Sequence, residues 1–202
     1  MAAEINADLV KNLRERTGAG IMDCKRALAE TSGDFAKAID YLRKKNLAGA
    51  LKRAARTASD GQVGAYIHMG GKIGVLIELN SETDFVAKTP DFAELVRDVA
   101  MHVAAANPQY VDPTAVPVDE VDKQKEIFRA QVADAKKPAN VVDQIVEGKL
   151  KKWYSEVCLT EQAFVKDTNR SVGDIVNEKS AKCGEKIAIR RFSRFQVGES
   201  VD

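Results

Sequence analysis

Apolar residues in the first fifty positions recur every three or four residues, which is the spacing of one face of a helix. Three such stripes are present, and they consist of Leu9, Val10 and Leu13; Ile21, Cys24 and Leu28; and Phe35, Ala38, Ile39 and Leu42. Asn6 can cap the first helix, Thr17–Gly20 ends it, and Gly33–Asp34 separates the second helix from the third. Helices this short bury little apolar surface, so residues 1–47 are predicted to form a small, marginally stable three-helix domain.

A basic segment follows, with six lysine and arginine residues and no acidic residue between Arg43 and Arg56. Its alanine and leucine content favours a helix, and its charge favours exposure to solvent. We therefore predict a basic helical linker over residues 48–60. A contact with an acidic protein surface or with RNA is the alternative interpretation.

The period of the pattern changes to two beyond Gly61, where valine, isoleucine and tyrosine become frequent. Strands are predicted over residues 62–68 and 72–80, and Met69–Gly71 between them is typical of a hairpin turn. Residues 186–197 alternate apolar and basic side chains, which predicts a third strand in the same antiparallel sheet.

Helical patterns lie between the second and third strands. Thr89 and Pro90 are residue types that begin a helix, and the apolar stripe after them continues to Ala106. The remaining predicted elements are helices over residues 119–134, 139–147, 149–158 and 172–182 and a loop over 160–170. Gly148 is expected to interrupt the helical pattern around it. Because strands and helices are segregated along the chain, residues 61–202 are predicted to form an α+β core domain.

Composition narrows the class of partner. The 202 residues include 31 lysines and arginines against 30 acids, and a net charge of +1 argues against binding nucleic acid through bulk phosphate attraction. No apolar run approaches the roughly 20 residues that span a bilayer, and the first residues lack the pattern of a secretory signal. Three widely spaced cysteines fit reduced apolar side chains, so a cytoplasmic location is predicted.

The sequence offers no familiar catalytic site. Phosphate-binding glycine loops and a nucleophile elbow are absent, and the two histidines and three cysteines lack metal-site spacing. Four acids lie close together in the chain: Glu78, Glu82, Asp84 and Asp91. Such carboxylates could pair for hydrolysis or hold a divalent ion, but without a ligand loop, solvation and helix N-terminal charge are the favoured roles. We predict no enzyme activity, no metal and no cofactor.

One apolar residue is out of place in this acidic stretch. Phe85 lies in the connection between the strand ending near Asn80 and the helix beginning at Thr89, where polar residues are usual. Local rules favour packing of its ring beneath the turn, because a large apolar side chain gains free energy on burial. Exposure for contact with another molecule is the alternative interpretation.

Two segments of the chain resemble the signatures of the translation elongation factor Ts family. The first is LRERTGAGIMDCKRAL, residues 13–28, and the second is ELNSETDFVA, residues 78–87. Shorter matches support them and are found at residues 100–105, 147–152, 162–166, 184–187 and 190–192. Ile21 departs from the methionine that the family usually has, a change that keeps an apolar side chain. The resemblance covers nearly the whole chain.

This resemblance implies a guanine-nucleotide exchange factor for elongation factor Tu, active in protein biosynthesis. In the family, the N-terminal helices are similar to a ubiquitin-associated domain and dock on the GTPase domain of the partner. The Thr-Asp-Phe-Val segment is inserted near the magnesium and phosphate site. The positions implied as partner contacts are Thr83, Asp84, Phe85 and Val86, then Arg14, Met22, Lys25 and His102.

Longer members of the family have two similar core subdomains in tandem. The length of this chain and its single set of core motifs imply one core subdomain, as in the short members. The short members are homodimers, so a homodimer built on the core domain is expected. Two rival hypotheses stay open. One is a protein-interaction module without a named partner, and the other is an RNA-binding translation protein that uses Arg43–Arg56 with Arg190, Arg191 and Arg194.

Overall fold

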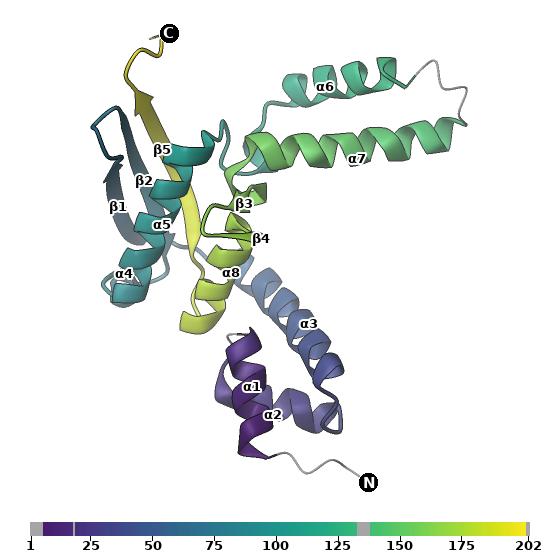
Figure 1. Cartoon of the computed structure of the whole chain (residues 1–202), viewed down its shortest axis with the longest axis vertical. Coiled ribbons are helices and arrows are strands. Elements are labelled where there is room, and N and C mark those ends of the chain that lie inside the picture. Colours follow the sequence, from purple (N-terminus) through teal and green to yellow (C-terminus); the bar gives the residue numbers. More distant parts are fainter. Residues whose placement is uncertain (1–5, 18, 133–137, 201–202) are drawn as a thin grey trace. The chain divides into compact units, whose positions relative to one another are not determined.

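The structure is a computed structural model that describes residues 6–17, 19–132 and 138–200. The chain packs as two compact units. One comprises the chain up to Gly61 together with Asn80–Ala87 and Asn177–Ala188, and the other comprises the rest. Figure 1 gives the order of the helices and strands.

Three helices form the N-terminal part: α1 (Ala7–Thr17), α2 (Ile21–Glu30) and α3 (Phe35–Ala54). They enclose a small core made of Leu13, Cys24, Ala27, Leu28, Ala38 and Leu42. The Asn6 side chain accepts the backbone N–H of Leu9 at 2.8 Å, which confirms the predicted cap. Gly18, part of the expected break after α1, lies outside the described residues.

The third helix is longer than the sequence pattern indicated. α3 has 20 residues and passes without interruption through the boundary expected at residue 47. Asp34 caps its start by accepting the backbone N–H of Lys37. Alanine, leucine, lysine and arginine are strong helix formers, and the single Gly49 among them does not break the helix. The prediction of a short third helix is therefore wrong, and most of the basic segment belongs to α3.

The main sheet has three strands: β1 (Asp60–Ile67), β2 (Ile73–Ser81) and β5 (Ala188–Gln196), in the order β1-β2-β5. The β1–β2 hairpin turns through Gly70 and Gly71, both with positive φ. Val197 N donates to Lys72 O, while Arg191 pairs with Glu78 farther along, so β5 runs antiparallel to β2. The predicted hairpin and the third strand are confirmed.

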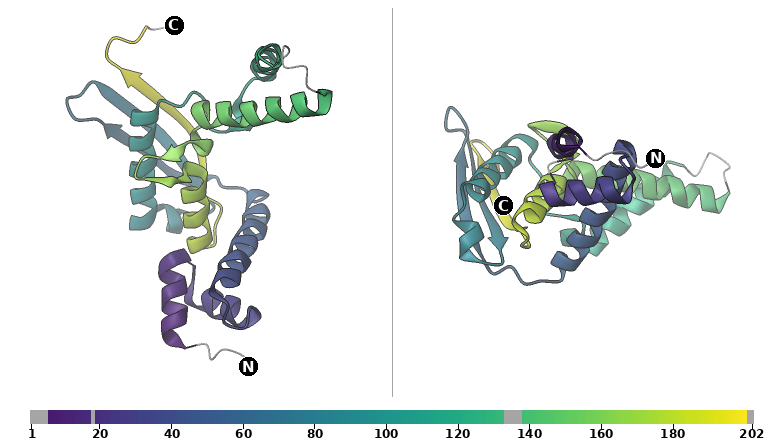
Figure 2. Two further views of the ribbon diagram at one scale, coloured as in Figure 1. Left: turned by 45° about the vertical axis from the view of Figure 1, so that its right-hand side comes forward. Right: turned by 90° about the horizontal axis from the view of Figure 1, so that it is seen from below.

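Helix α5 (Pro90–Ala106) covers one face of this sheet (Figures 1 and 2). Thr89 caps it by accepting the Phe92 N–H, Pro90 occupies the first turn, and Asn107 ends it in the left-handed conformation. The buried residues of β2 and α5 that form the core here are Val75, Ile77, Leu79, Phe92, Leu95, Val96, Val99 and Val103. The predicted α+β class is confirmed.

Gly64 on β1 is required by the close approach of α5. A Cβ atom at this position would lie 2.1 Å from Cγ1 of Val96. We expect Gly64→Ala to lower the free energy of unfolding by about 1–3 kcal/mol, because the core must shift to admit the methyl group. Thermal and urea unfolding followed by circular dichroism would measure the change. In a chain that already carries Val96→Ala, Gly64→Ala should lower the free energy of unfolding by less than it does in the parent chain, because the clashing Cγ1 atom of Val96 is absent.

Gly148 provides the matched control, because a Cβ there meets nothing within 4 Å. It lies inside α7 (Ala139–Val157), so Gly148→Ala should stabilise the chain by roughly 0.5–1 kcal/mol. Equal destabilisation by both alanine substitutions would contradict the assigned contact with Val96.

The helices after α5 differ from the prediction in one respect. The short helices η1 (Pro113–Ala115) and α6 (Val118–Ala130) lead to α7, which pairs with α6 as a helical hairpin (Figure 2). α7 is a single helix of 19 residues, so the predicted interruption at Gly148 is wrong. Val146 and Leu150 are both buried on the same side of α7, and this continuous apolar stripe outweighs the low helix propensity of glycine. Of the predicted helix 119–134, residues 133 and 134 lie outside the described part.

Residues 160–170 are not the simple loop that was predicted. They contain the end of the short helix η3 (Leu159–Glu161) and a second antiparallel sheet formed by β3 (Ala163–Phe164) and β4 (Asp167–Ser171). Strands of two and five residues are too short for a periodic pattern to identify. Helix α8 (Val172–Cys183) follows, and Gly184 directly after it has a φ of 78°, the left-handed conformation in which many helices end.

Candidate functional site

The connection after β2 holds Phe85 in solvent. Residues Asp84–Ala87 form a single helical turn, α4, and Phe85 within it is 81% exposed. Ser81 before the turn is fully buried, and Ala87 at its end is 3% exposed, so both ends of the turn are packed. The prediction from local rules that Phe85 packs beneath the turn is wrong, whereas the exposure expected from the family resemblance agrees with the structure.

Thr83 is held by hydrogen bonds to its backbone N–H, its hydroxyl and its backbone carbonyl. Its N–H donates to Glu185 Oε2 at 3.0 Å, and its hydroxyl donates to Glu185 Oε1 at 2.7 Å. Its carbonyl accepts the hydroxyl of the buried Ser81 at 2.9 Å. The residue that opens the exposed turn is therefore held by two side chains from different parts of the sequence.

Glu82 is anchored in the same region. The backbone N–H of Lys186 donates to Glu82 Oε1, and Arg56 Nη1 lies 3.1 Å from the same oxygen. The Lys186 N–H, followed by the charge and hydrogen bond of Arg56, holds the pKa of the Glu82 carboxyl below its usual range. Lys186 Nζ also donates to the carbonyls of Ala54 and Arg56 at 2.8 Å. These bonds join the end of α3 to the turn after Gly184.

The predicted contact residues of the N-terminal helices lie on the surface. Arg14, Met22 and Lys25 are all exposed, and Met22 is 68% exposed although it is apolar. A shallow hollow of about 450 Å³ is lined by Asn6, Ala7, Val10, Lys11, Arg14, Ile21 and Lys25. The lining combines apolar side chains with the basic Lys11, Arg14 and Lys25, which suits an acidic, partly apolar protein surface.

His102 does not lie on the surface. It is 1% exposed within α5, its Nε2 lies 3.0 Å from Gln162 Oε1, and its Nδ1 accepts the Val165 N–H at 3.2 Å. Burial lowers the pKa of the imidazole, an effect that the hydrogen bond to Gln162 partly opposes. The expectation that His102 contacts a partner is corrected accordingly, because both ring nitrogens bind groups inside the protein.

Sequence reasoning missed the residues that anchor the turn. Glu185 and Lys186 belong to a segment, 184–187, that matched the family without an assigned function. Glu185 is separated from Thr83 by 102 residues, so only folding brings the two together. The match to the family at residues 184–187 was the single available signal.

The four clustered acids do not form a metal site. Within the described residues, no group of three or more histidine, cysteine, aspartate or glutamate side chains could hold a metal ion. Glu78 instead pairs with Arg191 at 2.7 Å, and Glu82 is bound as described above. Glu78 and Glu82 were expected to be solvated or to lie at a helix N-terminus. In the structure each of them pairs with an arginine instead.

The cysteines are free thiols in different surroundings. Cys24 and Cys158 are buried, as expected for small apolar side chains, whereas Cys183 is exposed. Burial is the main reason why the pKa of Cys158 rises to about 11. No helix among the described residues has the length and apolar character that crossing a membrane requires.

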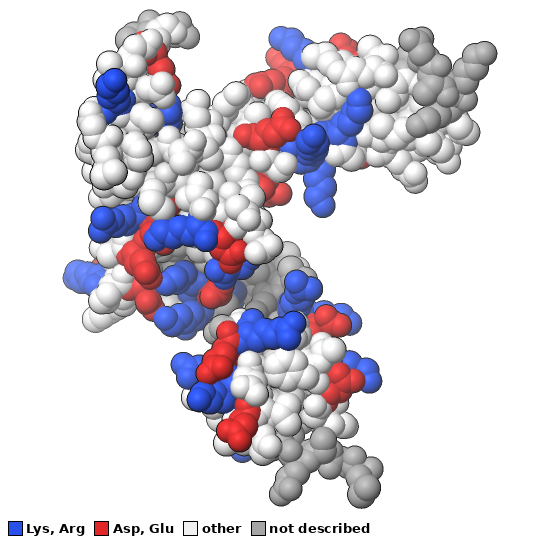
Figure 3. Space-filling view, viewed as in Figure 1, with Lys and Arg blue, Asp and Glu red and all other residues white. Residues whose placement is uncertain are grey.

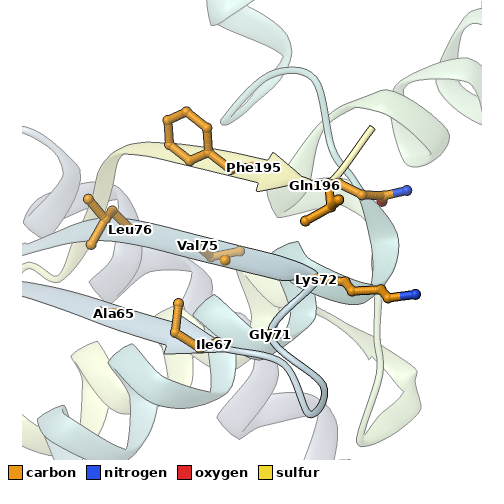
Figure 4. A pocket seen from close by; sticks show the side chains of 10 residues that line it. Ala65, Ile67, Gly71, Lys72, Val75, Leu76, Phe195 and Gln196 are labelled. Atoms are coloured by element: carbon orange, nitrogen blue, oxygen red, sulfur yellow. The ribbon is translucent and has the colours of Figure 1, made fainter. Parts of the chain in front are cut away.

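The second face of the main sheet is apolar and open. The exposed apolar side chains on it are Val63, Ile67, Leu76, Phe195 and Val197. Figure 4 shows Ile67, Leu76 and Phe195 on three neighbouring strands around a hollow of about 520 Å³. An apolar patch of this kind on a sheet is typical of a protein-interaction surface.

Comparison with known proteins identifies the family. A family model described as elongation factor TS matches residues 25–199. Proteins named elongation factor Ts are similar over almost their full length. The protein from Moorella thermoacetica is 60% identical, with 95% of each chain covered. The protein from Caldanaerobacter subterraneus is 56% identical over 98% of this chain and 99% of its own. The protein from Syntrophus aciditrophicus is 53% identical, with 98% of each chain covered. The chain therefore belongs to the elongation factor Ts family.

Proposed function

We propose that this chain binds the GDP-bound form of elongation factor Tu and accelerates the release of GDP during translation elongation. The observation that carries this proposal is the exposed Phe85, presented on a single helical turn whose two ends are packed. An aromatic ring that contributes little to its own fold is available as an anchor for another protein. Its neighbours Thr83, Asp84 and Val86 complete the contact segment.

The mechanism that we propose is mechanical and electrostatic. GDP is held in GTPases by a phosphate-binding loop and a coordinated Mg²⁺ ion. Insertion of the Phe85 ring near that site would displace the elements that support the ion and the phosphates. Binding of the factor and binding of GDP then weaken each other by the same factor. The chain changes the rate of exchange and leaves its overall equilibrium unchanged, so it acts without a catalytic residue.

A second contact would come from the N-terminal helices. Residues 1–47 would form a ubiquitin-associated-like docking domain, with Arg14, Met22 and Lys25 as the contact side chains. The basic segment 48–60 would connect this domain to the core, largely as the end of α3. Residues 61–202 would form the core domain. As a translation factor, the chain would act in the cytoplasm.

We also propose that the core domain forms a homodimer through the open face of the main sheet. Two sheets can pack face to face at about 10 Å, with interlocking apolar side chains. A second copy related by a two-fold axis would cover Leu76 and Phe195 with the same residues of the partner. This arrangement would remove the exposed apolar patch from water.

The rival RNA-binding hypothesis is less well supported. Arg56 binds Glu82 and the Gly184 carbonyl, and Arg191 pairs with Glu78. The Arg194 side chain is only 9% exposed and pairs with Glu199. On the face shown in Figure 3, acidic side chains lie among the basic ones. Phosphate binding would require free basic side chains gathered on one surface.

The release of fluorescent GDP from elongation factor Tu tests the proposal. Adding this chain with excess unlabelled nucleotide should accelerate the release in proportion to its concentration until the partner is saturated. A release rate equal to that without the chain, at micromolar concentrations of correctly folded protein, would exclude the exchange function. Retardation of RNA with a steep dependence on salt would support the rival hypothesis instead.

A further inference from the structure

We infer that Glu185 is a positioning residue that fixes the exposed turn for insertion into the partner, an inference that rests on the proposed exchange function. Its carboxylate accepts two hydrogen bonds from Thr83, one from the backbone N–H and one from the hydroxyl. Both donors of Thr83 are thereby bound to one side chain. Phe85 follows two residues later, and its ring is held in solvent.

Glu185 can fix Thr83 because its own backbone is fixed. The hydroxyl of Ser180, which is 4% exposed, donates to the Glu185 carbonyl and accepts the Ile187 N–H at 3.2 Å. The next residue, Lys186, is bound through its N–H to Glu82. The turn between α8 and β5 is therefore held at consecutive residues. A carboxylate on such a support has little freedom to move.

Thr83 is restrained from the other direction as well. Its carbonyl accepts the hydroxyl of Ser81, a fully buried residue at the end of β2. The same carbonyl accepts the Ala87 N–H at 3.3 Å, which closes the turn of α4. Every polar group of Thr83 thus has a partner in the free protein. The turn that presents Phe85 has its start fixed before any partner arrives.

Fixing this conformation in advance matters for an inserted segment. A mobile turn would lose conformational freedom when it enters the partner, and that loss opposes insertion. Insertion is the step that expels GDP, whereas docking through Arg14, Met22 and Lys25 does not involve Glu185. Loss of the Glu185 bonds should therefore lower the maximal rate of GDP release and leave the half-saturating concentration of the factor nearly unchanged. A general loss of folded protein would not produce this split.

The test uses the full-length chain and titrates it against elongation factor Tu loaded with fluorescent GDP. Glu185→Gln keeps the size of the side chain but replaces one acceptor oxygen by an NH₂ group. We expect its maximal release rate to fall about tenfold, as for the loss of one charge-assisted hydrogen bond, with the half-saturating concentration changed less than about twofold. Glu126→Gln, an exposed glutamate on α6, is the matched control and should behave as the parent chain.

Two further measurements separate positioning from a loss of stability. If Glu185 acts through Thr83, the losses of activity should be less than additive in the double variant Glu185→Gln with Thr83→Val, because both substitutions weaken the bond between the Thr83 hydroxyl and the Glu185 side chain. In the free protein, Glu185→Gln should increase hydrogen exchange at the Thr83 amide by about tenfold or more without a matching fall in Tm. Additive losses, or unchanged exchange at Thr83, would overturn the inference. A parent chain that leaves GDP release unaffected would instead refute the exchange function, and hydrogen exchange would still decide whether Glu185 holds Thr83.

Discussion

Replacing Phe85 by alanine should reduce kcat/KM for GDP release from elongation factor Tu by roughly 30- to 700-fold. This range corresponds to the 2–4 kcal/mol that truncation of an aromatic anchor costs at a protein interface. The ring is 81% exposed in the free chain, so its removal creates no cavity and the fold should be preserved. Phe85→Leu should retain an intermediate activity, because under the proposed mechanism a smaller apolar side chain would still displace, in part, the segments of elongation factor Tu that support the ion and the phosphates.

The control for this experiment is another exposed apolar residue. Val118 on α6 is 72% exposed, and Val118→Ala should leave the release rate unchanged. Thermal unfolding should show the same Tm for the parent chain and both alanine variants. If Phe85→Ala kept the full release rate, Phe85 would have no part in the mechanism, while membership of the elongation factor Ts family would stand.

A second large effect is expected at the open face of the sheet. Phe195→Asp should convert a dimer into a monomer at micromolar concentrations and raise the dissociation constant at least about a hundredfold. A carboxylate enclosed between two apolar sheet faces loses its hydration without gaining a partner, which costs several kcal/mol. Phe195 is 68% exposed in the single chain, so the monomer should remain folded.

Analytical ultracentrifugation over a range of protein concentrations would measure this equilibrium. Val118→Asp introduces the same charge at an exposed valine elsewhere and should not change the mass. A parent chain that stays monomeric at all concentrations would reject the dimer. Dimerisation that survives Phe195→Asp would place the interface on a different surface.

The elements that the sequence predicted correctly are those with local signals. Thr89 and Pro90 begin α5 because capping and a fixed φ act within one turn. Gly70 and Gly71 allow the hairpin turn because they adopt positive φ without strain. Such effects depend on residues next to one another in the chain. The predicted bounds of the three main strands and of α5 therefore agree with the structure to within two residues.

The errors have non-local causes. Gly148 looked like a break, but the buried side chains on either side of it keep α7 continuous. His102 lies in the apolar stripe of α5, and its burial follows from contacts with Gln162 and Val165, 60 and 63 residues away. Neither contact is visible from the residues around His102. Periodicity indicates that a face is buried without indicating which polar partners will meet it.

The candidate site was predicted in part for the same reason. The family resemblance pointed to Phe85, against the local preference of an apolar ring for burial. It could not supply the support beneath the ring, because the bonds from Glu185 and Ser81 depend on the folded arrangement of β2 and the turn after α8. The contact segment could be inferred from a motif, whereas its rigidity required the structure.

The separation of packed and exposed residues in the turn after β2 has an evolutionary consequence. Ser81 and Ala87 are buried at its ends, and Phe85 between them faces water. A library of variants sorted only for folded, protease-resistant protein should reject most substitutions at 81 and 87 and accept nearly all at 85. Sorting the same library for growth dependent on this factor should add position 85 to the rejected set. Two independent selection pressures would thus be distinguishable within seven consecutive codons.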